Sequence, residues 1–82
     1  MAFHSYVLRS RKDGRFYYGS TSALSSRIIA HNCGRVRSTK GRRPWVVWFF
    51  EEFQTKREAR QRESFYKSID GYHWLKDKGI IP

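Results

Sequence analysis

Five side chains of this sequence are candidates for one chemically active site. Tyr6 and Tyr17 carry phenol hydroxyls, which both donate and accept hydrogen bonds. Arg27 and His31 stand four residues apart, the spacing at which two side chains project from one side of a helix. Glu63 is the acidic residue that we can place beside these four, if it faces a cleft. A lone carboxylate there suits a hydrated Mg²⁺ ion, which keeps most of its water ligands.

Each of these residues also has an ordinary structural interpretation. Tyrosines in a sheet commonly pack and hydrogen-bond locally. Arg27 and His31 could be a cation at the rim of the core and a buried histidine with satisfied hydrogen bonds. Glu63 could form an exposed i, i+4 ion pair with Lys67, worth only about 0.3 to 0.5 kcal/mol. The two interpretations differ in geometry, because only an active site requires all five side chains to converge on one pocket.

Residues 3–9 and 16–21 are expected to form two antiparallel strands at the start of the fold. The first mixes apolar and polar residues, the second is rich in aromatic residues, and Asp13 and Gly14 supply a turn between them. Side chains alternate between the faces of a sheet. Tyr6 and Tyr17 therefore share a face only if the numbers of paired residues add up to an odd number, as an even-length turn provides.

Residues 22–33 are expected to form the first helix, because Leu24, Ile28 and His31 follow helical spacing. Ser22 is the expected N-cap, and Gly34 the residue that ends the helix. Residues 34–43 have no apolar periodicity, and we expect a flexible basic loop there. Its five cations are Arg35, Arg37, Lys40, Arg42 and Arg43.

The strand expected over residues 45–53 begins with a continuous aromatic and β-branched run, which suits a strand covered on both faces. We expect it to be the central or most buried strand. Thr55 and Glu58 form a capping box that begins a second helix, which is expected to run to about residue 68 and to be broken by Asp70 and Gly71. The expected inward face of this helix carries Ala59, Arg62, Tyr66 and Ile69. A short last helix is expected to end near residue 79, with residues 80–81 packing back on the core.

The element order predicts one α+β domain over residues 1–82. In this fold helices flank a small three-stranded antiparallel sheet, in the order ββαβα with a short C-terminal helix. A chain of 82 residues buries only roughly 60% of the surface that it exposes when unfolded, so we expect a single compact core. A content of 39% hydrophobic residues can fill it.

The charge of the chain predicts a polyanionic partner. Its 17 Lys and Arg against 7 Asp and Glu give a net charge of +10, and such an excess is most often used against nucleic acid. No apolar run approaches the ~18 residues that span a bilayer, and the start does not have the pattern of a secretory signal. The single Cys33 excludes an internal disulfide and a thiolate zinc cluster. We therefore expect a cytoplasmic protein, nucleoid-associated at most, with no membrane partner.

The order of the candidate residues resembles the GIY-YIG nuclease superfamily, in particular its small single-domain branch. The resemblance runs from about residue 3 to residue 67. Tyr6 stands at the end of the first triplet, which here reads His-Ser-Tyr, and residues 17–19 supply the second, which reads Tyr-Tyr-Gly. Arg27 and His31 follow on the next helix and Glu63 on a later one. The segments 24–32, 43–45, 58–59 and 62–63 are also close to the pattern of that branch. The Asn that several members carry after the metal-binding Glu has no counterpart here, since Asn32 precedes it.

This resemblance implies a metal-dependent endonuclease that hydrolyses phosphodiester bonds with one Mg²⁺ or Mn²⁺ held on Glu63. Arg27 would neutralise the non-bridging phosphoryl oxygens. A tyrosine, Tyr6 by preference, would accept the proton of the attacking water, with Tyr17 and His31 as relay partners. The sequence does not decide between Tyr6 and Tyr17 as the base. Gly19 would have a structural role in the motif. Cys33 is set aside as a nucleophile, because positions i and i+2 of a helix do not face one another.

The basic loop is expected to contact the nucleic-acid backbone, with DNA preferred over RNA. A domain of this size has little surface for reading bases, so structure-selective or weakly specific cleavage is expected. A role in DNA repair or recombination and a targeting protein partner would follow. One alternative is a non-catalytic nucleic-acid-binding module on the same scaffold. Another is a protein-interaction domain whose basic loop meets an acidic partner, which predicts no salt-sensitive DNA binding.

Overall fold

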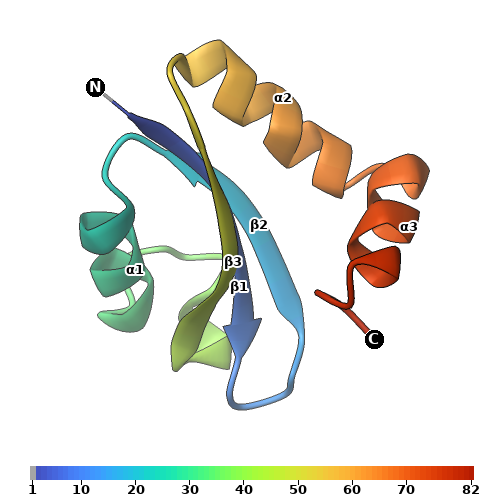
Figure 1. Cartoon of the computed structure of the whole chain (residues 1–82). Coiled ribbons are helices and arrows are strands. Elements are labelled where there is room, and N and C mark those ends of the chain that lie inside the picture. The colour runs from blue at the N-terminus through green and yellow to red at the C-terminus, as the bar shows by residue number, and fades with distance from the viewer. Residues whose placement is uncertain (1) are drawn as a thin grey trace.

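The computed structural model describes residues 2–82 as a three-stranded antiparallel sheet with helices on both sides (Figure 1). The elements are β1 (Phe3–Ser10), β2 (Phe16–Thr21), α1 (Leu24–Asn32), the 3₁₀ turn η1 (Lys40–Arg42), β3 (Trp45–Phe53), α2 (Lys56–Tyr66) and α3 (Ile69–Asp77). The α+β class and the element order are as predicted. Within residues 2–82 no helix combines the length and the apolar character needed to cross a bilayer.

The central strand is β1, because the sheet order is β2-β1-β3. The prediction that the strand over residues 45–53 is central or most buried is therefore wrong. Val47, Trp48 and Phe50 of this edge strand are 36%, 46% and 53% exposed. A bulge opposite Val7 and Leu8 interrupts the pairing of β1 with β3. An unbroken apolar sequence thus lies on an edge strand whose side chains are only partly covered.

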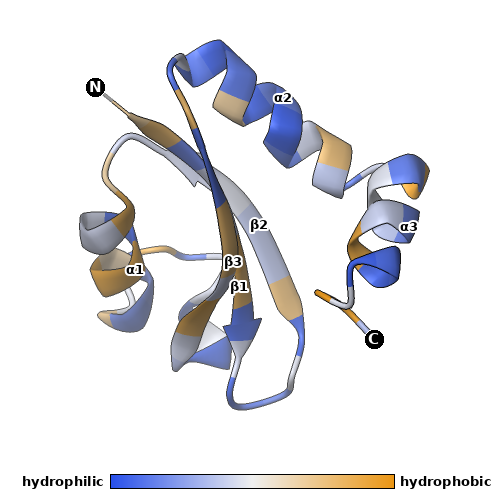
Figure 2. Ribbon diagram, viewed as in Figure 1, coloured by the Kyte–Doolittle hydropathy of each residue, from blue (hydrophilic) through white to orange (hydrophobic). Residues whose placement is uncertain are grey.

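Two hydrophobic clusters lie on opposite faces of the sheet, where a single core was expected. On the α1 side, Tyr6 and Leu8 pack with Trp45. On the side of α2 and α3, Val7 packs with Tyr66, Leu75 and Ile81. Successive residues of β1 point to opposite faces, so one central strand supplies both clusters. Figure 2 shows apolar residues on parts of the strands and of α1 and α3, whereas most of α2 is hydrophilic.

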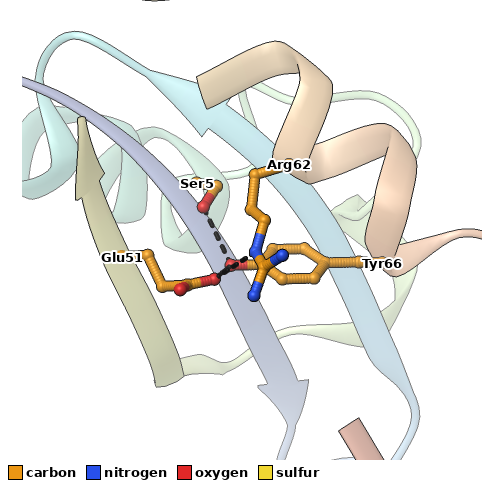
Figure 3. Close-up of polar contacts among 4 residues, drawn as sticks. All are labelled: Ser5, Glu51, Arg62 and Tyr66. Atoms are coloured by element: carbon orange, nitrogen blue, oxygen red, sulfur yellow. Dashed lines mark hydrogen bonds and ion pairs between the residues drawn. The ribbon is translucent and has the colours of Figure 1, made fainter. Parts of the chain in front are cut away.

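A polar network ties α2 to the sheet (Figure 3). Tyr66 donates a hydrogen bond of 2.6 Å to Oε1 of Glu51, and the Arg62 Nε binds the same oxygen at 2.8 Å. The Tyr66 hydroxyl has its one proton on Glu51, so it accepts the hydrogen bond of 2.8 Å from the Ser5 hydroxyl. The Arg62 guanidinium lies 4.4 Å from the ring centre of Trp74. These contacts, made by Arg62 and Tyr66, hold α2 against the sheet on both sides of Glu63 in the sequence.

The helix boundaries differ from those expected in two places. α1 begins after Ala23, without a side-chain cap, so Ser22 is not its N-cap, whereas Gly34 follows its end at a φ of +79° as expected. Thr55 caps α2 through the amide of Glu58, as expected. The break after α2 falls at Ser68, which caps α3, and not at the Asp-Gly pair, which lies in the first turn of α3.

One residue of the expected inward face of α2 does not point inward. Ala59 and Tyr66 are buried, but Ile69 begins α3 and is 77% exposed. The chain changes direction at the cap of α3, so helical spacing counted from α2 does not extend to residue 69. The expected return of the C-terminus does occur, with Ile81 buried in the cluster beside Leu75.

The basic loop is tethered, although we expected it to be flexible. Thr39 is fully buried, and its carbonyl accepts a hydrogen bond of 2.9 Å from the Trp45 indole. The Ser10 hydroxyl donates to the carbonyl of Arg42 at 2.6 Å. Two polar side chains of the strands thereby satisfy loop carbonyls, which holds the loop against the end of the sheet.

Candidate active site

The two hairpin phenols share one face of the sheet. Tyr6 pairs with Gly19 and Leu8 pairs with Tyr17, so the residue numbers of each pair add up to 25, the odd sum that the prediction requires. Tyr6 lies across Gly19, and a Cβ atom at position 19 would overlap its ring and hydroxyl. The absence of a side chain at Gly19 therefore lets the phenol of Tyr6 extend from the central strand across β2.

The phenol of Tyr6 is held from behind by His31. The Tyr6 hydroxyl lies 3.0 Å from Nε2 of His31, and Nδ1 of His31 lies 2.8 Å from the Thr39 hydroxyl. The Thr39 hydroxyl donates its one proton to the carbonyl of Val36, so it accepts from Nδ1–H of His31. Nε2 is then the free acceptor, and Tyr6 donates to it. Burial, together with the nearby Arg27 charge, lowers the pKa of His31 from 6.5 to about 4, which keeps this imidazole neutral at pH 7.

Arg27 and Tyr17 complete the α1 side of the site. Burial raises the pKa of Tyr6 above 10.0, and the Arg27 guanidinium opposes that shift. The Tyr6 phenol in turn raises the pKa of Arg27, so this side chain stays charged. The Tyr17 ring packs edge-on against His31, with ring centres 5.1 Å apart, and against Trp45. Tyr17 thus has a packing role as well as a hydroxyl in the pocket.

Glu63 reaches the same pocket from α2, on the other face of the sheet. Its Oε1 accepts a hydrogen bond of 2.7 Å from the Ser20 hydroxyl, and its Oε2 forms the expected ion pair of 2.9 Å with Lys67. The side chain is 24% exposed. Glu63 therefore forms the expected structural ion pair and also lies in the same pocket as the phenols.

A pocket of about 280 Å³ opens at the β2 edge between α1 and α2. Its lining consists of Tyr6, Tyr17, Gly19, Ser20, Arg27, Lys56, Arg60 and Glu63. Four of the five candidate side chains line it directly, and His31 stands behind Tyr6. The convergence on one pocket, which the active-site interpretation requires and the structural interpretation does not, is therefore present.

Three residues of the pocket were not singled out from the sequence. Ser20 was missed because it points to the opposite face from its neighbour Gly19. Lys56 and Arg60 precede Glu63 at helical spacing, which could have indicated them. The chain has many cations, however, and the rotation of α2 about its axis determines that these two face the pocket.

The cations of the basic loop do not line this pocket. The Arg42 guanidinium lies 5.3 Å from the ring centre of Trp45, and Arg43 Nε donates to the carbonyl of Lys40 at 2.8 Å. Arg35 and Arg37 are exposed at the surface. The structure thus brings the hairpin and helix residues predicted from the sequence to the pocket, whereas the loop residues lie outside it.

The donor set of the pocket fits a hydrated hard cation. Over residues 2–82 no group of three or more His, Cys, Asp or Glu side chains could hold a metal ion. Glu63 supplies one carboxylate beside the Ser20 hydroxyl, which matches a Mg²⁺ ion that keeps most of its waters. The set does not match Zn²⁺, which requires three or four nitrogen, sulfur or carboxylate ligands.

This fold and this pocket define a GIY-YIG domain, and the comparison with known families agrees. Residues 2–71 match the family described as GIY-YIG catalytic domain, so the chain belongs to the GIY-YIG family. It is 40% identical over 67 residues to the UPF0213 protein YazA of Bacillus subtilis, a match that covers 80% of this chain and 68% of that protein. It is also 38% identical over 77 residues to the UPF0213 protein SH2523 of Staphylococcus haemolyticus, covering 93% and 94%.

A solved structure has the same architecture. The solution NMR structure of the UPF0213 protein BH0048 from Bacillus halodurans matches with a TM-score of 0.57 and 29% sequence identity. The match covers 100% of this chain and 89% of that one. The family and the fold class predicted from the sequence are thereby confirmed.

Proposed function

We propose that this protein is a divalent-metal-dependent endonuclease that hydrolyses phosphodiester bonds of nucleic acid, DNA in preference to RNA. The observation that carries the proposal is the Tyr6 hydroxyl. It donates to the neutral His31 and borders a pocket that also contains Arg27 and Glu63. A phosphodiester in this pocket would have a proton acceptor, a cation and a carboxylate around it.

Tyr6 would accept the proton of the attacking water as a neutral phenol in a relay. Burial raises its pKa, so a standing phenolate is not the reactive form at neutral pH. The hydrogen bond to Nε2 of His31 occupies the phenol proton, which leaves the oxygen lone pairs of Tyr6 as acceptors. As the water loses its proton to Tyr6, Tyr6 can pass its own proton to His31. Tyr17 is the second choice as the base.

Two groups of the pocket would stabilise the charge that develops on the phosphate. The planar guanidinium of Arg27 would bind the non-bridging oxygens through two donors. Glu63 would hold the hydrated Mg²⁺ or Mn²⁺ ion, with Ser20 fixing one of its carboxylate oxygens. When bound, the ion supplies Lewis-acid stabilisation of the leaving oxygen. Gly19 keeps the path of the Tyr6 phenol open.

The proposal includes a biological setting. The domain as a whole, residues 1–82, would cleave with selectivity for DNA structure or with weak sequence specificity, because few exposed elements are free to read bases. DNA repair or recombination in the cytoplasm, with a protein partner that directs the enzyme to its substrate, fits such an activity. Arg35, Arg37, Lys40, Arg42 and Arg43 would add backbone contacts at a distance from the pocket.

The test of this function is plasmid nicking with and without Mg²⁺. We expect the Glu63→Gln variant to lose at least about 100-fold in nicking rate, as for a group that binds the transition-state charge. Glu58→Gln is the matched control, because it removes a carboxylate from the same helix while Gln can still complete the capping box. Equal rates for the wild type and the Glu63→Gln variant would refute the mechanism.

The alternative is a nucleic-acid-binding module without catalysis. It is favoured by one observation, the single carboxylate in the pocket. This alternative predicts salt-sensitive DNA binding with no Mg²⁺-dependent nicking under any condition. Nicking that requires both Mg²⁺ and Glu63 would exclude it.

A further inference from the structure

A second basic surface lies on α2, directly beside the pocket. A groove along this helix is lined by Lys56, Arg57, Arg60, Gln61 and Ser64. Lys56 and Arg60 line both this groove and the pocket that contains Glu63. The two hollows are therefore neighbours, and Lys56 and Arg60 lie on their common border.

The three cations of this groove have no acidic partner in residues 2–82. The ion pairs there join Arg62 to Glu51, Lys67 to Glu63 and His4 to Glu52. The acidic residue of the first turn, Glu58, accepts a hydrogen bond from the Thr55 hydroxyl and lines a different groove of α2. Lys56, Arg57 and Arg60 thus present uncompensated positive charge to solvent.

The position of these cations in the helix is electrostatically unfavourable. Lys56 and Arg57 are the first two residues of α2, and the N-terminal end of a helix carries a partial positive charge that repels cations. Neither residue forms an ion pair that would offset this repulsion within residues 2–82. Positive charge at these two positions does not stabilise the fold, whereas it would attract a bound polyanion.

We propose that Lys56, Arg57 and Arg60 bind the backbone phosphates of the strand that enters the pocket, so that this strand runs along α2. This inference rests on the proposed function, since it takes the strand to be the one that is cleaved. From Lys56 to Ser64 the helix extends about 12 Å at 1.5 Å per residue. Each strand of a duplex carries one phosphate per 3.4 Å of helix axis, so a duplex lying along α2 presents about three phosphates of this strand over that length. The amide of Gln61 and the hydroxyl of Ser64 can hydrogen-bond to phosphate or sugar oxygens.

This surface is distinct from the basic loop in what its cations do. In the loop, Arg42 stacks on Trp45 and Arg43 binds a loop carbonyl, so part of its charge supports the fold. On α2 the three cations are exposed, and two of them, Lys56 and Arg60, line the pocket that contains Glu63. The strand along α2 would therefore determine how the scissile phosphate is presented.

The experiment measures the affinity for a short fluorescein-labelled DNA of mixed sequence by anisotropy, in EDTA and over a series of salt concentrations. The triple variant Lys56→Gln, Arg57→Gln, Arg60→Gln is compared with the wild type. Its matched control, Arg15→Gln, Lys76→Gln, Lys78→Gln, removes the same charge from exposed sites that belong neither to α2 nor to the lining of the groove and the pocket. We expect the slope of log K against log salt to become shallower by about 2 in the α2 variant. In the control the slope should change by less than half of that.

A thermal melt separates this interpretation from misfolding. The α2 variant should melt at the same temperature as the wild type or higher, because it removes cations from a helix N-terminus. Equal slopes for the α2 variant and the control would overturn the inference, even if the wild type nicks plasmid DNA through Glu63. A shallower slope together with a wild type that never nicks would support the surface and refute the nuclease function.

Discussion

Two tyrosines, Tyr6 and Tyr66, are buried to the same degree on opposite faces of the sheet, each 1% exposed, yet their hydroxyls are placed for different tasks. Tyr66 donates to the carboxylate of Glu51 and accepts from Ser5, so both capacities of its oxygen are used inside the protein. Tyr6 donates to a neutral imidazole, and its oxygen borders a pocket. Burial alone therefore does not distinguish the phenol that we propose as catalytic from the structural one. What distinguishes them is that Tyr6 lines a pocket, whereas the Tyr66 hydroxyl is held between Glu51 and Ser5.

The charges beside the two phenols also differ, with a cation beside Tyr6 and a carboxylate beside Tyr66. Burial raises the pKa of both. The carboxylate of Glu51 raises that of Tyr66 further, whereas the guanidinium of Arg27 lowers that of Tyr6. Negative charge that develops on the oxygen is thus stabilised on the α1 side of the sheet and opposed on the α2 side.

The largest expected effect separates the two phenols by removing one hydroxyl at a time. Tyr6→Phe should lower the nicking rate about 10² to 10⁴-fold, the range for loss of a general base, and should cost about 1 kcal/mol of unfolding free energy. Tyr66→Phe should reverse this pattern. It removes a donor from a partly buried carboxylate, so it should cost about 1.5 to 3 kcal/mol, while the nicking rate falls less than about tenfold. Nicking assays and urea denaturation of both variants measure the four quantities.

The exposed phenol of Tyr72 provides the control for this pair. Tyr72→Phe changes neither network, so its nicking rate and unfolding free energy should stay near those of the wild type. If Tyr6→Phe and Tyr66→Phe reduced nicking equally, the distinction between a catalytic and a structural phenol would be wrong.

The second expected effect is a pH dependence of stability that only the Tyr6 network has. His31 has a pKa of about 4 in the folded protein and an unperturbed pKa of 6.5, because burial disfavours its charged form in the fold. Between these values the unfolded chain binds more protons than the folded one. The contribution of His31 to the free energy of unfolding is therefore fully present above about pH 6.5. It is lost as the pH falls toward 4, by at most about 3 kcal/mol.

Urea denaturation at several pH values between 4 and 7 measures this loss. The variant His31→Gln should be less stable than the wild type at pH 7 but should depend less on pH over this window. Tyr66→Phe should keep the pH dependence of the wild type, since no histidine belongs to its network. Identical pH profiles for wild type and His31→Gln would show that His31 is not held neutral by the fold.

How far the sequence predicts these two networks depends on the range of the interactions. The shared face of Tyr6 and Tyr17 could be predicted because the turn alone sets the pairing of a hairpin. The same holds for the cap of α2 at Thr55, since capping involves neighbours in the chain. A buried histidine was one interpretation of His31, which is fully buried, but its partner Thr39 could not be predicted because it comes from a loop whose path is not locally encoded.

Which strand is central could not be predicted, because strand order is a property of the whole sheet. The apolar run of β3 suggested a buried strand, but β1 takes that place with a mixed sequence. Its polar Ser5 is fully buried because Tyr66 binds its hydroxyl, and its neighbour Tyr6 serves the other face. Two adjacent residues of the first motif triplet thus belong to the two different networks, which explains why a polar residue is accepted there.

The smallest of the three expected effects tests how Tyr6, unlike Tyr66, reaches a pocket. In a strand, replacing Gly with Ala usually stabilises by roughly 0.5 to 1 kcal/mol. At Gly19 the new Cβ would overlap the phenol of Tyr6, so Gly19→Ala should instead destabilise by about 1 to 3 kcal/mol and slow nicking about 10 to 100-fold. Gly41→Ala is the control, because a Cβ there meets no atom within 4 Å.

A second background isolates the contact itself. In a Tyr6→Ala protein the ring that overlaps position 19 is gone, so Gly19→Ala should no longer destabilise. Urea denaturation of the four proteins of this cycle gives the coupling between the two positions. An equal loss of stability from Gly19→Ala in both backgrounds would mean that the glycine serves the backbone of β2 and not the path of the phenol. The contrast between Tyr6 and Tyr66 would then rest on their hydrogen-bond partners alone.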